Sequence, residues 1–334
     1  MLQLWWGMHP PHYRQIACCT DSWDHDINNI TQNGAHIYPD IIPSSASQLF
    51  SFYSQHRAII PFVQRIVNLQ ATQQSYNVSL TNAQNEQDIV TMARLKAIAA
   101  NGAADWKRTM PSSKQLHLGD IHYQLAAKIN LGVEVLPVPR RCFGCKKSDA
   151  CANDPLHYLS CNYHKRREIT MRHNAVVEVL HRNTLYAGGI AAMEPPNLSD
   201  EDGRRPDIQM ILNGQHILSD VRISHPCCPT HAPDAARHSL ATAKKAETGK
   251  IRKYRHTANI QAAQFIPFAV ETFGGLGPQA EKLIKQIIIT SRDQMILWPH
   301  LQLVEELRGA IAIAIQRGNA MTMLAGCAKC AQMA

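Results

Sequence analysis

The chain is predicted to be an α/β protein, with a helical N-terminal region, a small cysteine segment and a mixed β-sheet flanked by helices. Three observations predict this. Apolar residues recur at helical spacing through the Ala/Gln-rich residues 58–105. Paired cysteines follow a proline-rich break at Pro137-Val138-Pro139. From residue 165, the apolar patterns follow the order helix, strand, hairpin, helix, strand, helix, which is typical of a mixed sheet covered by helices.

The first elements are assigned by spacing and by helix-ending residues. A helix pair is expected within residues 58–105 and a further helix over 118–132, where Gly132 ends it. After the cysteines, Lys165–Leu185 has apolar residues three and four positions apart and is expected to be helical. Gly188-Gly189 ends this helix, and a short strand follows at 190–194.

Two apolar, β-leaning runs, Ile208–Leu212 and His216–Ile223, flank Asn213-Gly214. Asn-Gly between such runs is the strongest short signal for a two-residue hairpin loop. Each run is therefore expected to form one strand of a hairpin.

This loop fixes the expected register of the two strands. Leu212 pairs with Gln215, and counting outward pairs Asp207 with Asp220. Because directly opposed residues share a face of the sheet, the two carboxylates are expected side by side. The alternative is a surface hairpin that carries two solvated aspartates.

The remaining elements complete the predicted core. A basic helix is expected over Asp234–Thr257, with Asp234 as its N-cap, and a strand over Phe265–Val270. Two helices, at about 278–291 and 300–318, close the chain. The predicted domains are a mostly helical region (1–137), a zinc knuckle (138–164), the α/β core (165–291) and a C-terminal helix with a tail (292–334).

The composition limits which classes of binding partner are expected. The net charge of +8 favours an anionic partner, of which nucleic acid is the usual one. No run of 18 apolar residues occurs, so no membrane partner is expected. The ten cysteines come mostly as adjacent or CxxC pairs, which suit metal ligation in a reducing, intracellular compartment better than a disulfide framework.

The cysteine segment has the spacing of a zinc site. Cys142 and Cys145 are separated by two residues, and His157 and Cys161 by three. A set of three thiolates and one imidazole selects tetrahedral Zn²⁺. Cys151 and His164 are competing ligands, and unligated cysteines in a loop are the alternative.

The two aspartates suggest a second metal. Asp207 and Asp220 held side by side repel each other unless a cation lies between them, and Mg²⁺ or Mn²⁺ prefers such oxygen ligands. Two acids on a hairpin with a nearby lysine suit metal-assisted phosphodiester hydrolysis. Lys250 and Lys253, one turn apart on the basic helix, are both candidates for that lysine.

The motifs together resemble a known family. Their order is CxxC, HxxxC, Arg172-His173-Asn174, Glu194-Pro195, Arg205-Pro206-Asp207, Asp220-Val221-Arg222 and Lys250-xx-Lys253-Tyr254. Residues from about 118 to 277 resemble the zinc-knuckle and restriction-like endonuclease region found C-terminally in non-LTR retrotransposon reverse transcriptase proteins. That region is a branch of the PD-(D/E)xK nucleases.

The resemblance implies a restriction-endonuclease-like αβββαβ core and a nuclear, metal-dependent DNA endonuclease that nicks target DNA for retrotransposon insertion. It implies that Asp207 and Asp220 hold Mg²⁺ or Mn²⁺ and that Lys250 or Lys253 completes the site. Independently of the resemblance, His173 on the preceding helix is a candidate to transfer a proton or contact phosphate, and the alternative is a histidine that only packs. The implied partners are the target duplex, element RNA and a separate reverse transcriptase. The arginines expected on the DNA backbone are Arg166, Arg167, Arg172, Arg204 and Arg205.

The chain departs from the family pattern in two ways. The second acid is followed by Val221-Arg222, where the family has a lysine two positions on, and no Tyr-x-Asp-Asp polymerase motif occurs. The alternatives are a catalytically inactive nuclease-fold remnant that binds nucleic acid, another nuclease of the superfamily such as a junction resolvase or repair nuclease, and a structural zinc protein.

Overall fold

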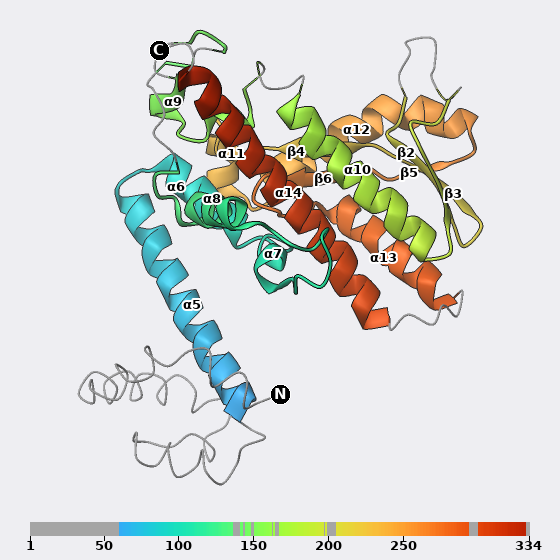
Figure 1. The fold of residues 1–334 in the computed structure, drawn as a ribbon, viewed down its shortest axis with the longest axis horizontal. Coiled ribbons are helices and arrows are strands. Elements are labelled where there is room, and N and C mark those ends of the chain that lie inside the picture. Colours follow the sequence, from blue (N-terminus) through green and yellow to red (C-terminus); the bar gives the residue numbers. More distant parts are fainter. Residues whose placement is uncertain are drawn as a thin grey trace. The chain divides into compact units, whose positions relative to one another are not determined.

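The computed structural model is of mixed α/β class, with a helical N-terminal region and a small mixed sheet, as predicted (Figure 1). The chain divides into two compact units, Met1–Val78 and Ser79–Ala334. The structure describes residues 60–135, 141–142, 144–147, 150–161, 163, 167–196, 198, 205–293 and 300–331.

The helices expected before the cysteine segment are present. They are α5 (Ile60–Asn85), α6 (Ile89–Ile98), α7 (Asp105–Arg108) and α8 (Asp120–Leu131). Gly132 ends α8 in the left-handed conformation, with φ of 72°, and its N–H bonds back to the carbonyls of Lys128 and Ile129. Within the described residues of the cysteine segment lie α9 (Ala150–Asn153) and the 3₁₀ turn η1 (His157–Leu159).

The predicted hairpin and its register are confirmed. Strands β2 (Ile208–Leu212) and β3 (Gln215–Ser219) pair antiparallel from Ile208↔Ser219 to Leu212↔Gln215. Asn213 and Gly214 have φ values of 48° and 76°, as a type I′ turn requires. The sheet continues to β1 (Ile190–Met193) on one side and to the short parallel strand β5 (Gln264–Phe265) on the other.

The single strand predicted over His216–Ile223 is wrong, because the chain changes sheets at Asp220. After β3, the segment β4 (Val221–Ser224) pairs in parallel with β6 (Phe268–Glu271) in a separate two-stranded sheet. The matching break between β5 and β6 contains Pro267, which has no N–H to donate to a ladder. The switch places Asp220 between β3 and β4, as a residue that belongs to neither strand.

The helices of the C-terminal half differ from the prediction in two places. The helix expected over Asp234–Thr257 is two helices, α11 (Ala232–Arg237) and α12 (Ala241–Ile260), separated by Leu240 in the left-handed conformation. Asp234 lies in the first turn of α11 and is not its N-cap, which is His231. After α13 (Pro278–Asp293), helix α14 (His300–Ala331) is longer than predicted. No helix in the described part of the chain is both long and apolar enough to cross a membrane.

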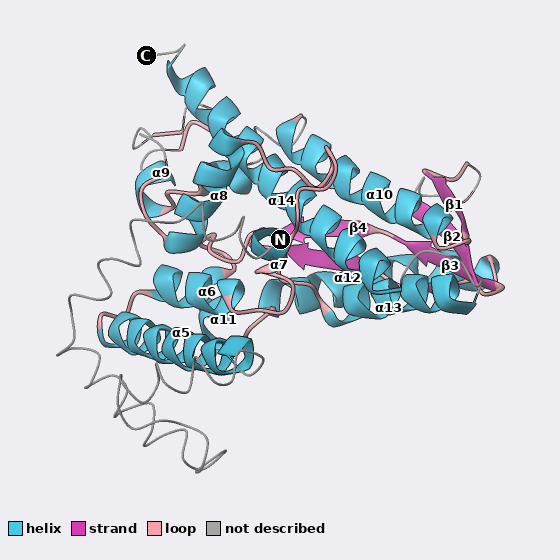
Figure 2. Ribbon diagram, turned by 60° about the horizontal axis from the view of Figure 1, so that its bottom comes forward, coloured by secondary structure: helices cyan, strands magenta, loops and turns pink. Residues whose placement is uncertain are grey.

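The core is built between helices and strands. Helix α10 (Glu168–Tyr186) packs along α14, and with α13 these helices cover strands β2, β4 and β6 (Figure 2). A second apolar cluster joins the cysteine segment to α6, α8, α11 and the C-terminal half of α14. The segments predicted as zinc knuckle, α/β core and C-terminal helix therefore share packed surfaces within the unit Ser79–Ala334.

The hairpin turn yields a stability prediction. Gly214 has positive φ, yet a Cβ built there meets nothing within 4 Å. Gly214→Ala should therefore destabilise the protein by about 1 kcal/mol through backbone strain alone. Gly249→Ala is the matched control, because Gly249 lies within α12 with equally open space around its Cβ. This control should stabilise the protein by roughly 0.5–1 kcal/mol. Denaturant titration of both variants measures the two effects, and equal changes would contradict the predicted strain at Gly214.

Candidate functional site

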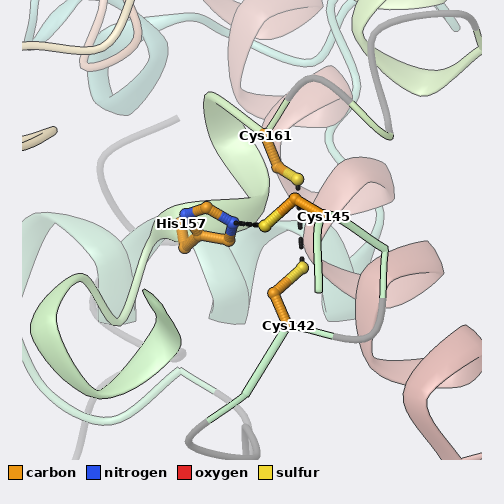
Figure 3. Close-up of side chains that lie close together, drawn as sticks. All are labelled: Cys142, Cys145, His157 and Cys161. Carbon is orange, nitrogen blue, oxygen red and sulfur yellow. Dashed lines mark hydrogen bonds between the residues drawn. The ribbon is translucent and has the colours of Figure 1, made fainter. Parts of the chain in front are cut away.

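The four predicted zinc ligands converge. The ligand atoms of Cys142, Cys145, His157 and Cys161 all lie within 4.8 Å of one another (Figure 3). The Cys142 and Cys161 sulfurs are 3.9 Å apart, and the Cys145 sulfur is 3.3 Å from Nε2 of His157. Tetrahedral ligation with Zn–S bonds of about 2.3 Å places two sulfurs roughly 3.8 Å apart. The donor set and its spacing thus fit a zinc ion.

Local structure brings the ligands together. The 3₁₀ turn η1 begins at His157, so that Cys161 follows one short turn later. Tyr158 and Leu159, between them, are buried in the second apolar cluster and hold the turn in place. Cys151, the competing ligand, is buried outside the group of four, and His164 lies outside the described residues.

The pKa values of two of the cluster's thiols shift in opposite directions. Burial raises the pKa of the Cys161 thiol to about 12. Burial alone would also raise the pKa of Cys145, but the backbone N–H of Lys147, the neighbouring thiols and the Lys147 charge outweigh it and lower that pKa. A buried thiolate is costly without a cation, and zinc supplies that cation while displacing the protons. The cluster is therefore a site that can hold zinc.

A second group of polar residues gathers where β3 meets β4. Asp207, just before β2, accepts a hydrogen bond from the backbone N–H of Val221 at 2.7 Å. The same oxygen, Oδ2, lies 3.0 Å from Nε2 of His173 on α10. The hairpin register, which ends at Ile208↔Ser219, thus brings the Asp207 side chain to the backbone of the residue that follows Asp220. Both of these contacts use Oδ2 of Asp207.

Asp220 is held by helix α12. The ammonium of Lys250 forms an ion pair with Oδ2 of Asp220, and the Tyr254 hydroxyl donates to Oδ1 at 2.6 Å. Lys253 instead donates to the Tyr254 hydroxyl at 2.9 Å and lies 4.4 Å from the centre of its ring. Of the two candidate lysines, Lys250 is therefore the one in direct contact with a site carboxylate.

Tyr254 is a site residue that the sequence analysis did not assign. Its ring is buried against Phe265, and its hydroxyl lies within hydrogen-bonding distance of the Arg205 carbonyl as well as of Asp220. It joins the segment before β2 to the junction after β3. The Lys-Tyr pair of the family motif was the available signal, but it did not indicate which carboxylate the tyrosine would meet.

The pKa of His173 is shifted by the carboxylates of this site. Burial lowers its pKa, but the hydrogen bond and charge of Asp207, the hydrogen bond with Asn174 and the charge of Asp220 outweigh burial and raise the pKa overall. Nε2 faces Asp207 and Nδ1 faces the Asn174 side-chain oxygen, so both ring nitrogens act as donors in the charged form.

The site remains open to solvent. The side chains of His173, Asp207 and Lys250 are 29%, 22% and 21% exposed, whereas Asp220 is 5% exposed. A ligand or a metal ion can therefore reach the Asp207 side of the site.

Helix α12 is fixed by two buried carboxylates. Glu271, at the end of β6, accepts a hydrogen bond from the Thr242 hydroxyl at 2.6 Å in the first turn of α12. Glu247 of α12 accepts the backbone N–H of Gln279 at 2.8 Å and so caps α13. Burial raises the pKa of both carboxyls. These contacts hold the helix that carries Lys250 and Tyr254.

The arginines expected on DNA have different surroundings. Arg172 is 2% exposed and donates to Asn319 of α14 at 2.7 Å and to the Leu159 carbonyl at 3.3 Å. Its expected DNA contact is therefore corrected to a packing role between α10, α14 and the cysteine segment. Arg167 and Arg205 are exposed, and Arg205 pairs with Glu194 at 2.5 Å. Arg166 and Arg204 lie outside the described residues.

The cysteine cluster predicts a bound metal. Protein purified without chelator should contain about one equivalent of zinc by elemental analysis, because three thiols and an imidazole meet at tetrahedral spacing. Cys142→Ser should lose that zinc. It should also lower the free energy of unfolding by more than an ordinary substitution does, which is about 0.5–3 kcal/mol, and so lower the melting temperature. Cys151→Ser is the control and should keep the zinc. Zinc retained by Cys142→Ser but lost by Cys151→Ser would mean that the ligand assignment is wrong.

The His173–Asp207 pair predicts a pH-dependent contribution to stability. A histidine whose pKa is raised on folding stabilises the protein fully below its ordinary pKa of about 6.5, and this contribution is lost as pH rises through the raised value. His173→Gln should therefore lower the free energy of unfolding at pH 5.5, by up to about 1 kcal/mol, and change it less at pH 9. Denaturant titrations at both pH values measure this, with the exposed His256→Gln as control. A larger loss at pH 9 would contradict the pairing.

No family model matches this sequence, and a search of curated proteins gives no match.

Proposed function

We propose that this protein is a metal-dependent DNA endonuclease with a restriction-like core, related to the nuclease region of non-LTR retrotransposon proteins. The observation that supports it most is the convergence of Asp207, Asp220 and Lys250 at the end of the β2–β3 hairpin. These residues come from three separate parts of the chain, and the proposal assigns a chemical task to each.

The order of elements also supports the proposal. From α10 the elements follow the order α10, β1, β2, β3, β4, α11, α12, β5, β6 and α13, and the proposal takes α10, β1–β3, α12 and β6 as the αβββαβ core. The two acids flank the hairpin, and Lys250 on the later helix α12 would replace the lysine that the family has two positions after the second acid.

The cofactor that we propose for this site is a hard divalent cation. Asp207 and Asp220 provide carboxylate oxygens, the ligands that Mg²⁺ and Mn²⁺ prefer. When bound, such an ion makes a water molecule more acidic and neutralises charge on the phosphate. The structure's own cations, Lys250 and His173, already face these carboxylates, so a metal ion would share or replace those contacts.

Each remaining residue then has a defined task. Lys250, released in part from Asp220, would donate to a non-bridging phosphate oxygen and stabilise the pentavalent transition state. His173 would give its Nε2 proton to the departing oxygen or hold the phosphate. Tyr254 keeps Asp220 oriented through its hydroxyl.

The proposed nick in target DNA would serve retrotransposition. A nick that leaves a 3′-hydroxyl provides a primer for reverse transcription, and this chain has no Tyr-x-Asp-Asp motif of its own. We propose that target DNA in the nucleus is its substrate and that element RNA or a reverse transcriptase is its partner.

One observation favours a second candidate, an inactive nuclease-fold protein that still binds nucleic acid. The Lys250–Asp220 ion pair occupies one carboxylate directly, and Arg222 stands where the family has a lysine. A permanent ion pair of this kind would neutralise Asp220 in place of a metal ion. The two candidates differ in cleavage and agree in binding.

The endonuclease proposal predicts metal-dependent nicking of supercoiled plasmid. Wild-type protein should convert the plasmid to the open circle in Mg²⁺ or Mn²⁺, and EDTA should prevent this. Asp207→Ala should slow nicking at least about a hundredfold, the scale for losing one group that stabilises transition-state charge. Affinity for the plasmid should change little, because it depends mainly on Lys and Arg contacts with phosphate.

A matched acid provides the control for this variant. Asp234 is an exposed aspartate of α11 that pairs with Arg237 at 3.1 Å, and Asp234→Ala should nick at the wild-type rate. Wild-type protein that binds DNA but leaves it intact in both metals would favour the inactive, nucleic-acid-binding candidate. Protein that neither binds nor cuts would leave a structural zinc protein.

A further inference from the structure

The solvent-facing side of α12 is strongly basic, and apart from Lys253, which contacts Tyr254, its exposed cations were given no role in the site described above. Its exposed cationic side chains are Lys244, Lys245, Arg252, Lys253, Arg255 and His256. The one acid on the helix, Glu247, is buried and caps α13. The exposed side of α12 therefore carries charge of a single sign.

The spacing of these residues makes a continuous stripe. Lys245, Gly249, Arg252 and His256 follow one another at intervals of four, three and four residues, and so lie on one face of the helix. At a rise of 1.5 Å per residue, this stripe is about 16 Å long. One strand of duplex DNA carries a phosphate for about every 3.4 Å of the duplex axis, so the stripe is long enough to contact more than one phosphate.

Gly249 at the centre of the stripe is unexplained by the fold. It lies inside a 20-residue helix, and a Cβ placed there meets nothing within 4 Å. Its φ is not in the positive range, so the backbone does not require glycine either. Glycine within a helix costs roughly 0.5–1 kcal/mol relative to alanine. Neither packing nor backbone conformation therefore requires glycine at this position. Lys245, Arg252 and Lys253 lie one turn away on the same face, and the missing side chain lets an outside group approach the helix closely there.

We infer that this face of α12 seats the sugar-phosphate backbone of a DNA strand, with Gly249 as the point of closest approach. The inference rests on the proposed function for its choice of DNA. It extends that function, because the same helix that presents Lys250 to Asp220 would position the strand beside them. Lys245 and Arg252 would flank a phosphate above Gly249, and Lys253 would extend the contact toward the site.

Two variants of the full-length protein test this inference by fluorescence anisotropy on a labelled duplex of arbitrary sequence, over a range of salt concentrations. Lys245→Gln with Arg252→Gln should weaken binding about tenfold or more and lower the slope of log affinity against log salt by about one unit per lost phosphate contact. Gly249→Ala should also weaken binding, although it should raise the melting temperature. A purely structural role for Gly249 would not produce that opposite pair of effects.

The control removes the same charge from a different helix. Lys282→Gln with Lys285→Gln takes away two exposed lysines one turn apart on α13 and should leave the salt slope nearly unchanged. The inference is overturned if the α12 double variant binds as the control does, or if Gly249→Ala binds like wild type.

The outcomes separate this inference from the endonuclease proposal. If the α12 variants lose affinity while wild type fails to nick in Mg²⁺ or Mn²⁺, the binding surface stands and only the endonuclease proposal falls. If wild type nicks DNA and the α12 variants bind normally, the endonuclease proposal stands and this surface is rejected.

Discussion

The pairing register of β2 and β3 is the constraint on which the candidate carboxylate site depends. Asn213 and Gly214 both adopt positive φ, which sets a two-residue turn and hence the pair Leu212↔Gln215. A slip of one residue would turn every side chain of the strand to the other face. Burial of alternate β2 residues, Ile208 and Met210 among them, against α10 and α13 opposes such a slip. Asp207 therefore reaches the backbone beside Asp220 only because the apolar face of β2 is fixed.

Electrostatic pairing explains how two carboxylates are tolerated at this junction. Asp207 has His173 and the Val221 N–H, while Asp220 has Lys250 and Tyr254. Each acid thus has its own cationic partner, supplied by a different helix. Because the partners are a histidine of raised pKa and a lysine at the end of a flexible chain, pH or a bound cation can exchange them without moving the backbone. Strand pairing fixes the backbone beside the two carboxylates, whereas His173 and Lys250 are side-chain partners that a cation can replace.

The cysteine cluster and the carboxylate site are linked through packing. Arg172, adjacent to His173 on α10, donates to the carbonyl of Leu159 within the cysteine segment and to Asn319 on α14. A zinc ion at the cluster would fix the position of η1, and through Leu159 and Arg172 it would support the helix that carries His173. Zinc binding would then contribute to the order of the whole unit, since metal-binding free energy is folding free energy in such sites.

The sequence by itself determined the features that depend on neighbouring residues. The Asn213-Gly214 turn, the end of α8 at Gly132 and the CxxC and HxxxC spacings are local, so the hairpin register, the end of that helix and the cluster of three cysteines and one histidine could be predicted. Tertiary structure decided the features that depend on distant packing. Packing separates β4 from β3 at Asp220, divides the long basic helix at Leu240 and buries Arg172. It also places Lys250 and Tyr254 in contact with Asp220. Periodicity reveals which face of an element is apolar, but a side chain's partner is fixed only when elements far apart in the chain pack together.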